Sequence, residues 1–433
     1  MFLLALSAIP IGVLTVGWLS RYPIAHLAVV LTGFILMFNY TEGIQVSEAL
    51  FGLYYVGYLG TWVLRSTCDP DIKIIRSKSD VIFILFMSYS LFALFYGLLG
   101  GWSPLDAINQ WRVMLIFAFF FPVREAIIKD VKSLKIVIAS IAILTTILVT
   151  RNYIRYIEAF YSAEALWEIA VNRSSRTGER VTMLGLFGFL YFSLLKSASV
   201  KLKLISVFML TYHLVSLILS QSRTIWLAVV VGLVFSLLFL SRQQKIKLVY
   251  TLSIGVIVSA IAALVVLGPF FSIVIDQLSL RVQTSTSLSQ DISLVNRFYE
   301  WETVYKVILE SPIFGYGYGA RYKFYSLVYV GTEFKMFSHS TLLTQLFRLG
   351  LLGSGLLLAW IVSILPHALR LIRESKPNST NQALAVTALG FFAALSIASL
   401  TEAIFSTADG PFIVTIPLAL LAGASARLHS SNG

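Results

Sequence analysis

Long apolar runs are the feature that most constrains what this chain can fold into. Runs of about 18 to 22 apolar residues recur along nearly the whole 433-residue sequence, and each is long enough to cross the roughly 30 Å hydrocarbon core of a bilayer. Charged residues make up 12% of the chain, about half of the roughly 25% typical of soluble proteins. A transmembrane β-barrel would show alternating segments of about 10 residues, which the sequence lacks. It therefore predicts an all-α, polytopic transmembrane helical bundle.

We expect 12 or 13 spans, depending on whether two segments merge or one is re-entrant. The apolar N-terminus lacks the basic region and the cleavage site of a signal peptide, so we interpret it as the first span. The whole chain, 1–433, is expected to form one integral membrane domain, with a long polar loop at 269–339 inserted between spans. The spans are expected near 1–19, 23–40, 46–64, 81–100, 107–123, 134–150, 181–196, 204–221, 223–241, 249–268, 340–366, 381–400 and 410–426.

The connections between the spans alternate in charge. Every second connection is basic, and by the positive-inside rule these face the cytoplasm. The basic residues are Arg65, Lys73, Arg76 and Lys78; Lys129, Lys132 and Lys135; Lys196, Lys201 and Lys203; Arg242, Lys245 and Lys247; and Arg370, Arg373 and Lys376. The other connections, at 101–106, 151–180, 221–223, 269–339 and 401–409, are then predicted to face outward. The two longest polar segments thus fall on the same, non-cytoplasmic side.

The net charge of +12 is explained by these basic connections, so we expect no nucleic-acid partner. Membrane lipid is the expected surrounding. The single cysteine, Cys68, cannot form an internal disulfide. No Cys/His cluster has metal-ligand spacing, so no metal and no cofactor are expected.

The segment 297–353 is the long polar stretch where function is expected. Apolar residues from Leu294 to Leu309 recur at helical spacing, which predicts a short amphipathic helix lying along the membrane face. Glycines at 315, 317 and 319 alternate with aromatic residues. This pattern indicates a turn that lets the backbone approach a ligand or another helix.

Several outward arginines suggest an anion site, each with a plainer reading beside it. Arg223 stands between two apolar runs in Ser220-Gln221-Ser222-Arg223. It either snorkels to the interface or directs its guanidinium at an anionic group such as phosphate. The loop at 151–180 holds five arginines, including Arg176 and Arg180. They form either a solvated face balanced by glutamates or part of an anion site.

His339 differs from the other four histidines because it stands at the start of a span on the loop side. His26 and His213 lie inside apolar runs, and His367 and His429 fall at the ends predicted to be cytoplasmic. His339 is therefore the candidate general base, or hydrogen-bonding partner, for a reaction at the outer interface.

Four motifs in order resemble the O-antigen ligase superfamily, whose members are membrane glycosyltransferases of the GT-C type. They are Ser-x-Ser-Arg at 220–223, Arg-x-x-x-Trp at 297–301, Ser-Pro-x-x-Gly-x-Gly at 311–317, and His-Ser-x9-Gly-x-x-Gly at 339–353. Ser340 stands where many members have Asn, and Gly355 where ligases often have a bulkier residue. The resemblance covers about 220–360 and leaves the subfamily, ligase or polymerase, open.

The resemblance implies metal-independent transfer of a glycan from undecaprenyl diphosphate to an acceptor hydroxyl on the periplasmic face of the bacterial inner membrane. The acceptor would be lipid A-core in a ligase and another lipid-linked glycan in a polymerase. Arg223 and Arg297 would bind the diphosphate, and His339 would orient or deprotonate the acceptor. Further substrate contacts are expected from Arg176, Arg180, Ser222, Tyr316, Gly317, Gly319 and Ser340. The alternative function is a transporter or flippase of lipid-linked oligosaccharide, which would place charges in mid-membrane.

Overall fold

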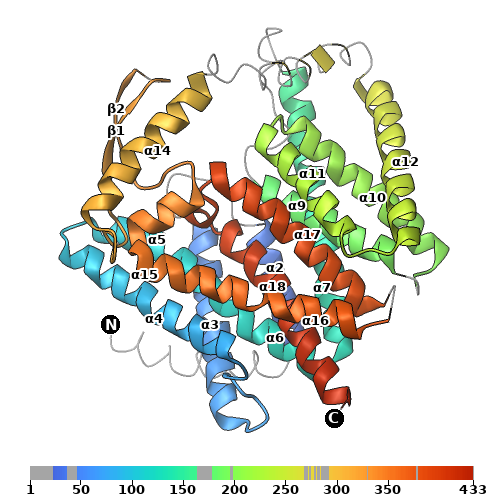
Figure 1. The fold of residues 1–433 in the computed structure, drawn as a ribbon, viewed down its shortest axis with the longest axis horizontal. Coiled ribbons are helices and arrows are strands. Elements are labelled where there is room, and N and C mark those ends of the chain that lie inside the picture. Colours follow the sequence, from blue (N-terminus) through green and yellow to red (C-terminus); the bar gives the residue numbers. More distant parts are fainter. Residues whose placement is uncertain are drawn as a thin grey trace.

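The computed structural model describes residues 23–36, 46–162, 178–195, 198–267, 292–328, 330–376 and 379–432, with a few single positions between 272 and 283. Almost all of this is helix (Figure 1). The elements are α2 (Pro23–Leu36), α3 (Val46–Cys68), α4 (Lys78–Leu99), α5 (Pro104–Met114), η1 (Leu115–Phe119), α6 (Phe120–Lys129), α7 (Val131–Tyr161), α9 (Glu179–Leu194), α10 (Val200–Leu219), α11 (Arg223–Leu237), α12 (Arg242–Leu267), α14 (Ile292–Glu310), β1 (Tyr322–Ser326), β2 (Gly331–Lys335), α15 (Thr341–Ser363), α16 (Leu365–Glu374), α17 (Thr380–Thr401), η4 (Ile404–Ser406) and α18 (Asp409–Asn432).

The prediction of an all-α polytopic bundle is confirmed. Six helices in the described part of the chain are long and apolar enough to cross a membrane, and two shorter apolar helices accompany them, at 24–35 and 223–237. The six are Lys78–Leu99, Val131–Ala159, Val200–Leu219, Thr341–Glu374, Thr380–Thr401 and Asp409–His429. Within the described residues each expected span from 23–40 onward overlaps one or more helices, whereas the expected first span, 1–19, lies outside the described residues.

The contacts between the connections fall into two groups, one at each end of the bundle. At the first, the loop end, the connections predicted to face outward contact one another. These contacts join Asp106 to Arg321 (2.6 Å), Arg180 to Glu402 (3.5 Å), Thr224 to Thr401 (2.8 Å) and Thr341 to the carbonyl of Glu402 (2.5 Å). At the opposite, basic end, the basic connections meet through Lys129–Asp69 (3.0 Å), Arg76–Glu125 (3.0 Å) and Lys247 with the Ser193 carbonyl (3.5 Å). This grouping matches the alternation in the sequence, while the sidedness in the membrane stays a prediction.

A buried ion pair fastens the basic end. Arg124 of α6 pairs with Asp80 in the first turn of α4, and both side chains are almost fully buried. The second carboxylate oxygen of Asp80 accepts the backbone N–H groups of Arg76 and Ser77, each at 2.8 Å. Because these bonds satisfy the buried carboxylate, the charge is tolerated inside the protein.

The expected single span at 107–123 is wrong in detail, because the structure divides it into α5, η1 and α6. Pro122 lies in the first turn of α6, where its missing N–H removes no helical bond that the preceding residues need. The 3-10 segment η1 has a tighter turn than an α-helix. The hydroxyl of Tyr55 donates to the carbonyls of Leu115 (2.9 Å) and Ile116 (3.4 Å) in this segment.

The helix expected at 294–309 is present as α14, while its placement along the membrane face stays a prediction. Asn296, Glu300, Val304 and Ile308 recur every four residues along its buried face. Val304 and Ile308 pack with residues of the β1–β2 hairpin and with Phe347 of α15 in a small core of their own. In Figure 1 this unit, α14 with the hairpin, stands beside the end of α15 and well apart from α10 to α12.

The helix α15 is broken at Gly350, whose backbone angles (φ 61°, ψ −168°) are not helical. The segment Pro312–Gly317 fits against this break through four backbone hydrogen bonds. Tyr316 and Gly317 donate to the carbonyls of Phe347 and Arg348 (both 2.9 Å), while Leu351 and Leu352 donate to Pro312 (2.8 Å) and Ile313 (3.2 Å). The turn glycines thus let one backbone approach another, which fixes α14 relative to α15.

Gly350→Ala is expected to lower the stability of the protein by a few kcal/mol. A Cβ at this position would lie 2.2 Å from the carbonyl oxygen of Ile313. The backbone conformation alone costs an L-residue on the order of 1–3 kcal/mol, and overpacking adds a similar amount. The matched control is Gly355→Ala in the same helix, where a Cβ meets nothing within 4 Å. Thermal unfolding in detergent measures both, and equal midpoints would contradict the packing role of Gly350.

Candidate active site at the loop end

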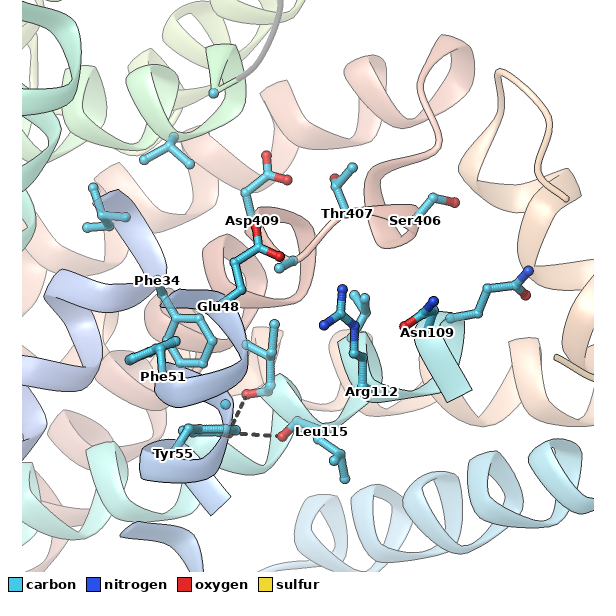
Figure 2. A pocket seen from close by; sticks show the side chains of 18 of the residues that line it. Phe34, Glu48, Phe51, Tyr55, Asn109, Arg112, Leu115, Ser406, Thr407 and Asp409 are labelled. Atoms are coloured by element: carbon cyan, nitrogen blue, oxygen red, sulfur yellow. Dashed lines mark hydrogen bonds between the residues drawn. The ribbon is translucent and has the colours of Figure 1, made fainter. Parts of the chain in front are cut away.

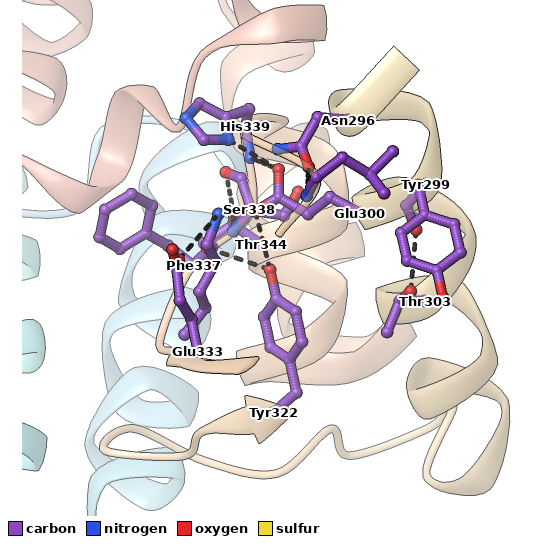
Figure 3. A network of polar contacts seen from close by, with 12 residues as sticks. Asn296, Tyr299, Glu300, Thr303, Tyr322, Glu333, Phe337, Ser338, His339 and Thr344 are labelled. Atoms are coloured by element: carbon purple, nitrogen blue, oxygen red, sulfur yellow. Dashed lines mark hydrogen bonds and ion pairs between the residues drawn. The ribbon is translucent and has the colours of Figure 1, made fainter. Parts of the chain in front are cut away.

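The centre of the site is a histidine held by a buried carboxylate. Figure 3 shows the side chain of His339, just before α15, meeting Glu300 from α14. The distance from His339 Nδ1 to Glu300 Oε2 is 2.6 Å, and the backbone N–H of His339 donates to the same oxygen at 3.2 Å. The Glu300 side chain is fully buried, whereas that of His339 is 41% exposed. The side of the imidazole ring away from Glu300 is therefore accessible.

Glu300 also has partners on its other oxygen. Lys335 Nζ lies 3.0 Å from Glu300 Oε1, and the hydroxyl of Tyr322 donates to that atom at 3.2 Å. Burial by itself would raise the pKa of Glu300, but the hydrogen bonds and positive charges of His339 and Lys335 hold this pKa at about 2. Desolvation and the neighbouring Glu300 carboxylate raise the pKa of Tyr322, so its hydroxyl keeps its proton.

An ionised carboxylate can only accept hydrogen bonds. Because Glu300 is ionised, the proton of His339 must lie on Nδ1, the atom that faces Glu300. Whenever the ring is neutral, its lone pair therefore lies on Nε2. This is the arrangement of a general base oriented by a carboxylate.

The second part of the site is the segment 401–409, which connects α17 to α18. Arg180, in the first turn of α9, holds it by ion pairs to Glu402 (3.5 Å) and Asp409 (3.3 Å). The guanidinium also donates to the Ile404 carbonyl (3.3 Å) and to Thr407 Oγ1 (3.2 Å). Arg180 was predicted to contact substrate, and the structure gives it these protein partners. Substrate contact by Arg180 stays a prediction.

The segment 401–409 brings other predicted residues close. Thr341, two residues after His339, bonds to this segment. Its hydroxyl donates to the Glu402 carbonyl and accepts the N–H of Ile404 (2.9 Å). Burial raises the pKa of Glu402, while Arg180, Arg297 and His339 act in the opposite direction through their charges. Arg297 and His339 therefore lie within electrostatic reach of Glu402.

Arg223 is the first residue of α11 and is half-buried. Its neighbour Thr224 bonds Thr401, the residue before Glu402, so Arg223 belongs to the same end of the bundle. Ser222 occupies the N-cap position of α11 without a side-chain capping bond. Ser340 caps α15 by accepting the N–H of Leu343 at 3.5 Å. Gln221 has a positive φ of 55°, a conformation that non-glycine residues seldom adopt.

Arg297 lies on α14 about one helical turn before Glu300, and its side chain is half-buried. Within the described residues its guanidinium makes no hydrogen bond or ion pair. A guanidinium in this position can take a bidentate anion such as a phosphate group. Substrate binding by Arg297 stays a prediction.

The remaining predicted residues have other surroundings. Tyr316 donates its hydroxyl to the Val307 carbonyl and to Glu310, both at 3.0 Å, and so closes the end of α14. Gly317 and Gly319 are buried, against α4 and against Ala107 and Trp102 respectively. Their packing explains the glycines without a ligand, and substrate binding by these three residues is untested. Arg176 lies outside the described residues.

A cavity of about 760 Å³ adjoins this site, between the N-terminal helices and the segment 401–409 (Figure 2). Helix α3 contributes Glu48, Phe51 and Tyr55, and α5 contributes Asn109 and Arg112. The lining also includes Arg180, Met336, Phe337, Arg348, Thr407 and Asp409. Within the described residues no group of three or more His, Cys, Asp and Glu is arranged to hold a metal ion.

Comparison with known proteins agrees with the motifs. A family model described as O-Antigen ligase matches residues 204–358, a region from α10 to most of α15. No curated protein matches the chain. The matched region contains Arg223, Arg297, Glu300 and His339. Residues 204–358, about a third of the chain, are therefore similar to the O-antigen ligase family, which agrees with the resemblance of the motifs.

Proposed function

We propose that the protein transfers a glycan from undecaprenyl diphosphate to an acceptor hydroxyl on the periplasmic face of the inner membrane. The superfamily supports glycan transfer of the ligase/polymerase type in general. The observation that carries the finer proposal is the His339–Glu300 pair. The pair provides a base, and both His339 and Arg297, whose guanidinium suits a diphosphate, lie within electrostatic reach of Glu402.

In the proposed reaction the acceptor hydroxyl attacks the anomeric carbon of the donor sugar. A C–O bond forms as the bond from that carbon to the diphosphate oxygen breaks. The hydroxyl proton passes to Nε2 of His339, and undecaprenyl diphosphate leaves with the bonding electron pair. Glu300 stabilises the imidazolium that results, because its buried carboxylate faces Nδ1.

The leaving diphosphate gains negative charge as the bond breaks. Arg297 and Arg223 are proposed to stabilise this charge, since fixed positive groups in a site of low polarity favour such a transition state. In this proposal the arginines supply the charge that a divalent cation supplies in other enzymes. Transfer is therefore expected to persist in the presence of EDTA.

The test is an in vitro transfer assay with purified protein and undecaprenyl-diphosphate-linked glycan, with lipid A-core present or absent. A single shifted product band that requires lipid A-core identifies a ligase. A ladder of longer products without lipid A-core identifies a polymerase. If no product forms and the lipid-linked glycan instead crosses a liposome bilayer, the transporter alternative holds and the proposal fails.

Arg297→Lys is expected to lower transfer substantially, although the charge is kept. Lysine is a point donor and cannot reproduce the bidentate contact of a planar guanidinium with phosphate oxygens. Arg321→Lys is the matched control, since Arg321 is an exposed residue of the same loop that pairs with Asp106. Initial rates of product formation compare the two. Full activity of Arg297→Lys would mean that only charge at this position matters.

A further inference from the structure

Four residues that line the cavity beside the site carry buried polar atoms without partners in the described part of the protein. Asn109 Oδ1, Gln110 Nε2, Ser406 Oγ and two guanidinium nitrogens of Arg348, Nε and Nη1, are buried and have no hydrogen-bond partner in the described part of the chain. All four residues line the cavity. A buried polar group without a partner costs on the order of 1–3 kcal/mol, so a cluster of them indicates a place where a polar ligand binds.

Two charged side chains add to this cluster. Glu48, in the first turn of α3, is only 6% exposed, and it lines the cavity. Arg112 of α5 lines it as well, and Figure 2 shows both side chains in the cavity. Among the residues that the structure describes, neither side chain makes a hydrogen bond or an ion pair. Acceptors and donors are therefore both available to a ligand.

The mixture of groups selects the class of ligand. A diphosphate is disfavoured, because Glu48 and Asp409 place carboxylates on the same walls. A lipid chain is disfavoured too, since it would leave every polar group unpaired. A sugar fits, because each hydroxyl both donates and accepts. The apolar ring faces of a sugar can pack on Phe51 and Tyr55, which also line the cavity.

The place of the cavity suits this ligand. Met336 and Phe337 line it, and His339 follows two residues later. Arg348 Nη2 donates to the Met336 carbonyl at 3.1 Å, so the guanidinium links this wall to α15. The volume of about 760 Å³ falls in the range of roughly 300–1,000 Å³ found for small-molecule pockets.

We propose that this cavity is a glycan subsite, in which Glu48, Asn109, Arg112 and Arg348 bind sugar hydroxyls next to His339. The inference rests on the proposed function and names a part of the substrate that the motif residues do not account for. Most of these residues come from α3 and α5, outside the region that the family model matches. The sugars belong to the donor glycan or to the acceptor glycan, and the experiment separates the two.

The experiment measures binding of free oligosaccharides to the full-length protein in detergent by saturation-transfer NMR. One probe is the oligosaccharide released by mild acid from the lipid-linked donor, and the other is the core oligosaccharide freed from lipid A. Wild type is expected to bind one of them. Asn109→Ala and Glu48→Gln are each expected to weaken that binding on the order of tenfold, the value of one buried hydrogen bond.

Asn381→Ala is the matched control, because Asn381 lies in the first turn of α17 at the opposite end of the bundle. It should bind like wild type, and thermal unfolding confirms that each variant is folded. His339→Ala should also keep binding, since it removes the base and not the subsite. Binding of neither oligosaccharide, or equal binding by wild type and both cavity variants, overturns the subsite.

Transfer, measured on the same preparations, separates this inference from the proposed function. The cavity variants are expected to raise KM for the glycan substrate and to change kcat little. If wild type transfers glycan but the cavity variants bind oligosaccharide as well as wild type does, the subsite is contradicted and the proposed function is not. Cavity-dependent binding without any transfer would sink the proposed function and leave a sugar site.

Discussion

His339→Ala is expected to lower glycan transfer by roughly 10²–10⁴-fold, the usual contribution of a general base. The acceptor hydroxyl then has no group to take its proton in the transition state. The fold should persist, because the side chain is 41% exposed and its hydrogen bond is to Glu300 alone among the described residues. Single-turnover product formation measures the loss, and thermal unfolding checks the fold.

The control for this variant is His429→Ala, in the last turn of α18. His429 is exposed at the end of the bundle away from the site, so its replacement should leave transfer unchanged. A second variant, His339→Gln, keeps a hydrogen bond to Glu300 but supplies no base. If His339→Gln transferred glycan at the wild-type rate, His339 would orient a group and would not accept the proton.

Much of the fold could be predicted because apolar length and loop charge are local signals. Each span follows from its own composition, and the alternation of basic connections already separates the two ends of the bundle. The same alternation put Arg180, Arg223, Arg297 and His339 on one side of the chain, and the structure brings these residues around the segment 401–409. Their chemical roles remain predictions.

The partners of these residues could not be predicted, because they come from distant parts of the chain. Glu300 lies 39 residues before His339, and in the sequence it is one of several charges in an amphipathic helix. Glu402 and Asp409 follow His339 by many residues and carry no motif. The polar stripe of α14, Asn296 and Glu300 on its buried face, is the one signal that could have indicated an inward carboxylate.

The loop glycines are a second case that the sequence could not decide. Their spacing indicated a close approach of the backbone to a ligand or to a helix, and the sequence could not decide between these. The structure gives helix packing as the reason, at Gly315 against α15 and at Gly317 against α4. The family motif is therefore in part a joint between α14 and α15. That joint sets the position of His339 relative to Glu300.

Glu300→Gln is expected to impair both transfer and stability. An amide cannot stabilise the imidazolium of His339, and its NH₂ group can donate to Nδ1, which moves the ring proton to Nε2. Nε2 of His339 would then already carry a proton and could not accept one from the acceptor hydroxyl. We expect a fall in kcat of the order of that for His339→Ala, with little change in KM. Glu302→Gln is the control on the same helix, since Glu302 is exposed and pairs only with Lys306 in the described structure.

The stability effect depends on pH in a direction that follows from the lowered pKa. Glu300 goes from its ordinary pKa of 4.5 to about 2 in the folded protein, and each pKa unit corresponds to about 1.4 kcal/mol. The ionised carboxylate thus contributes about 3 kcal/mol above pH 4.5, and this contribution is lost as the pH falls from 4.5 towards 2. The gap in unfolding midpoint between wild type and Glu300→Gln should therefore narrow over that range. If this difference in unfolding midpoint stayed constant with pH, the charge of Glu300 would not contribute to stability. Glu300 would then be neutral, and a neutral carboxyl does not determine the tautomer of His339.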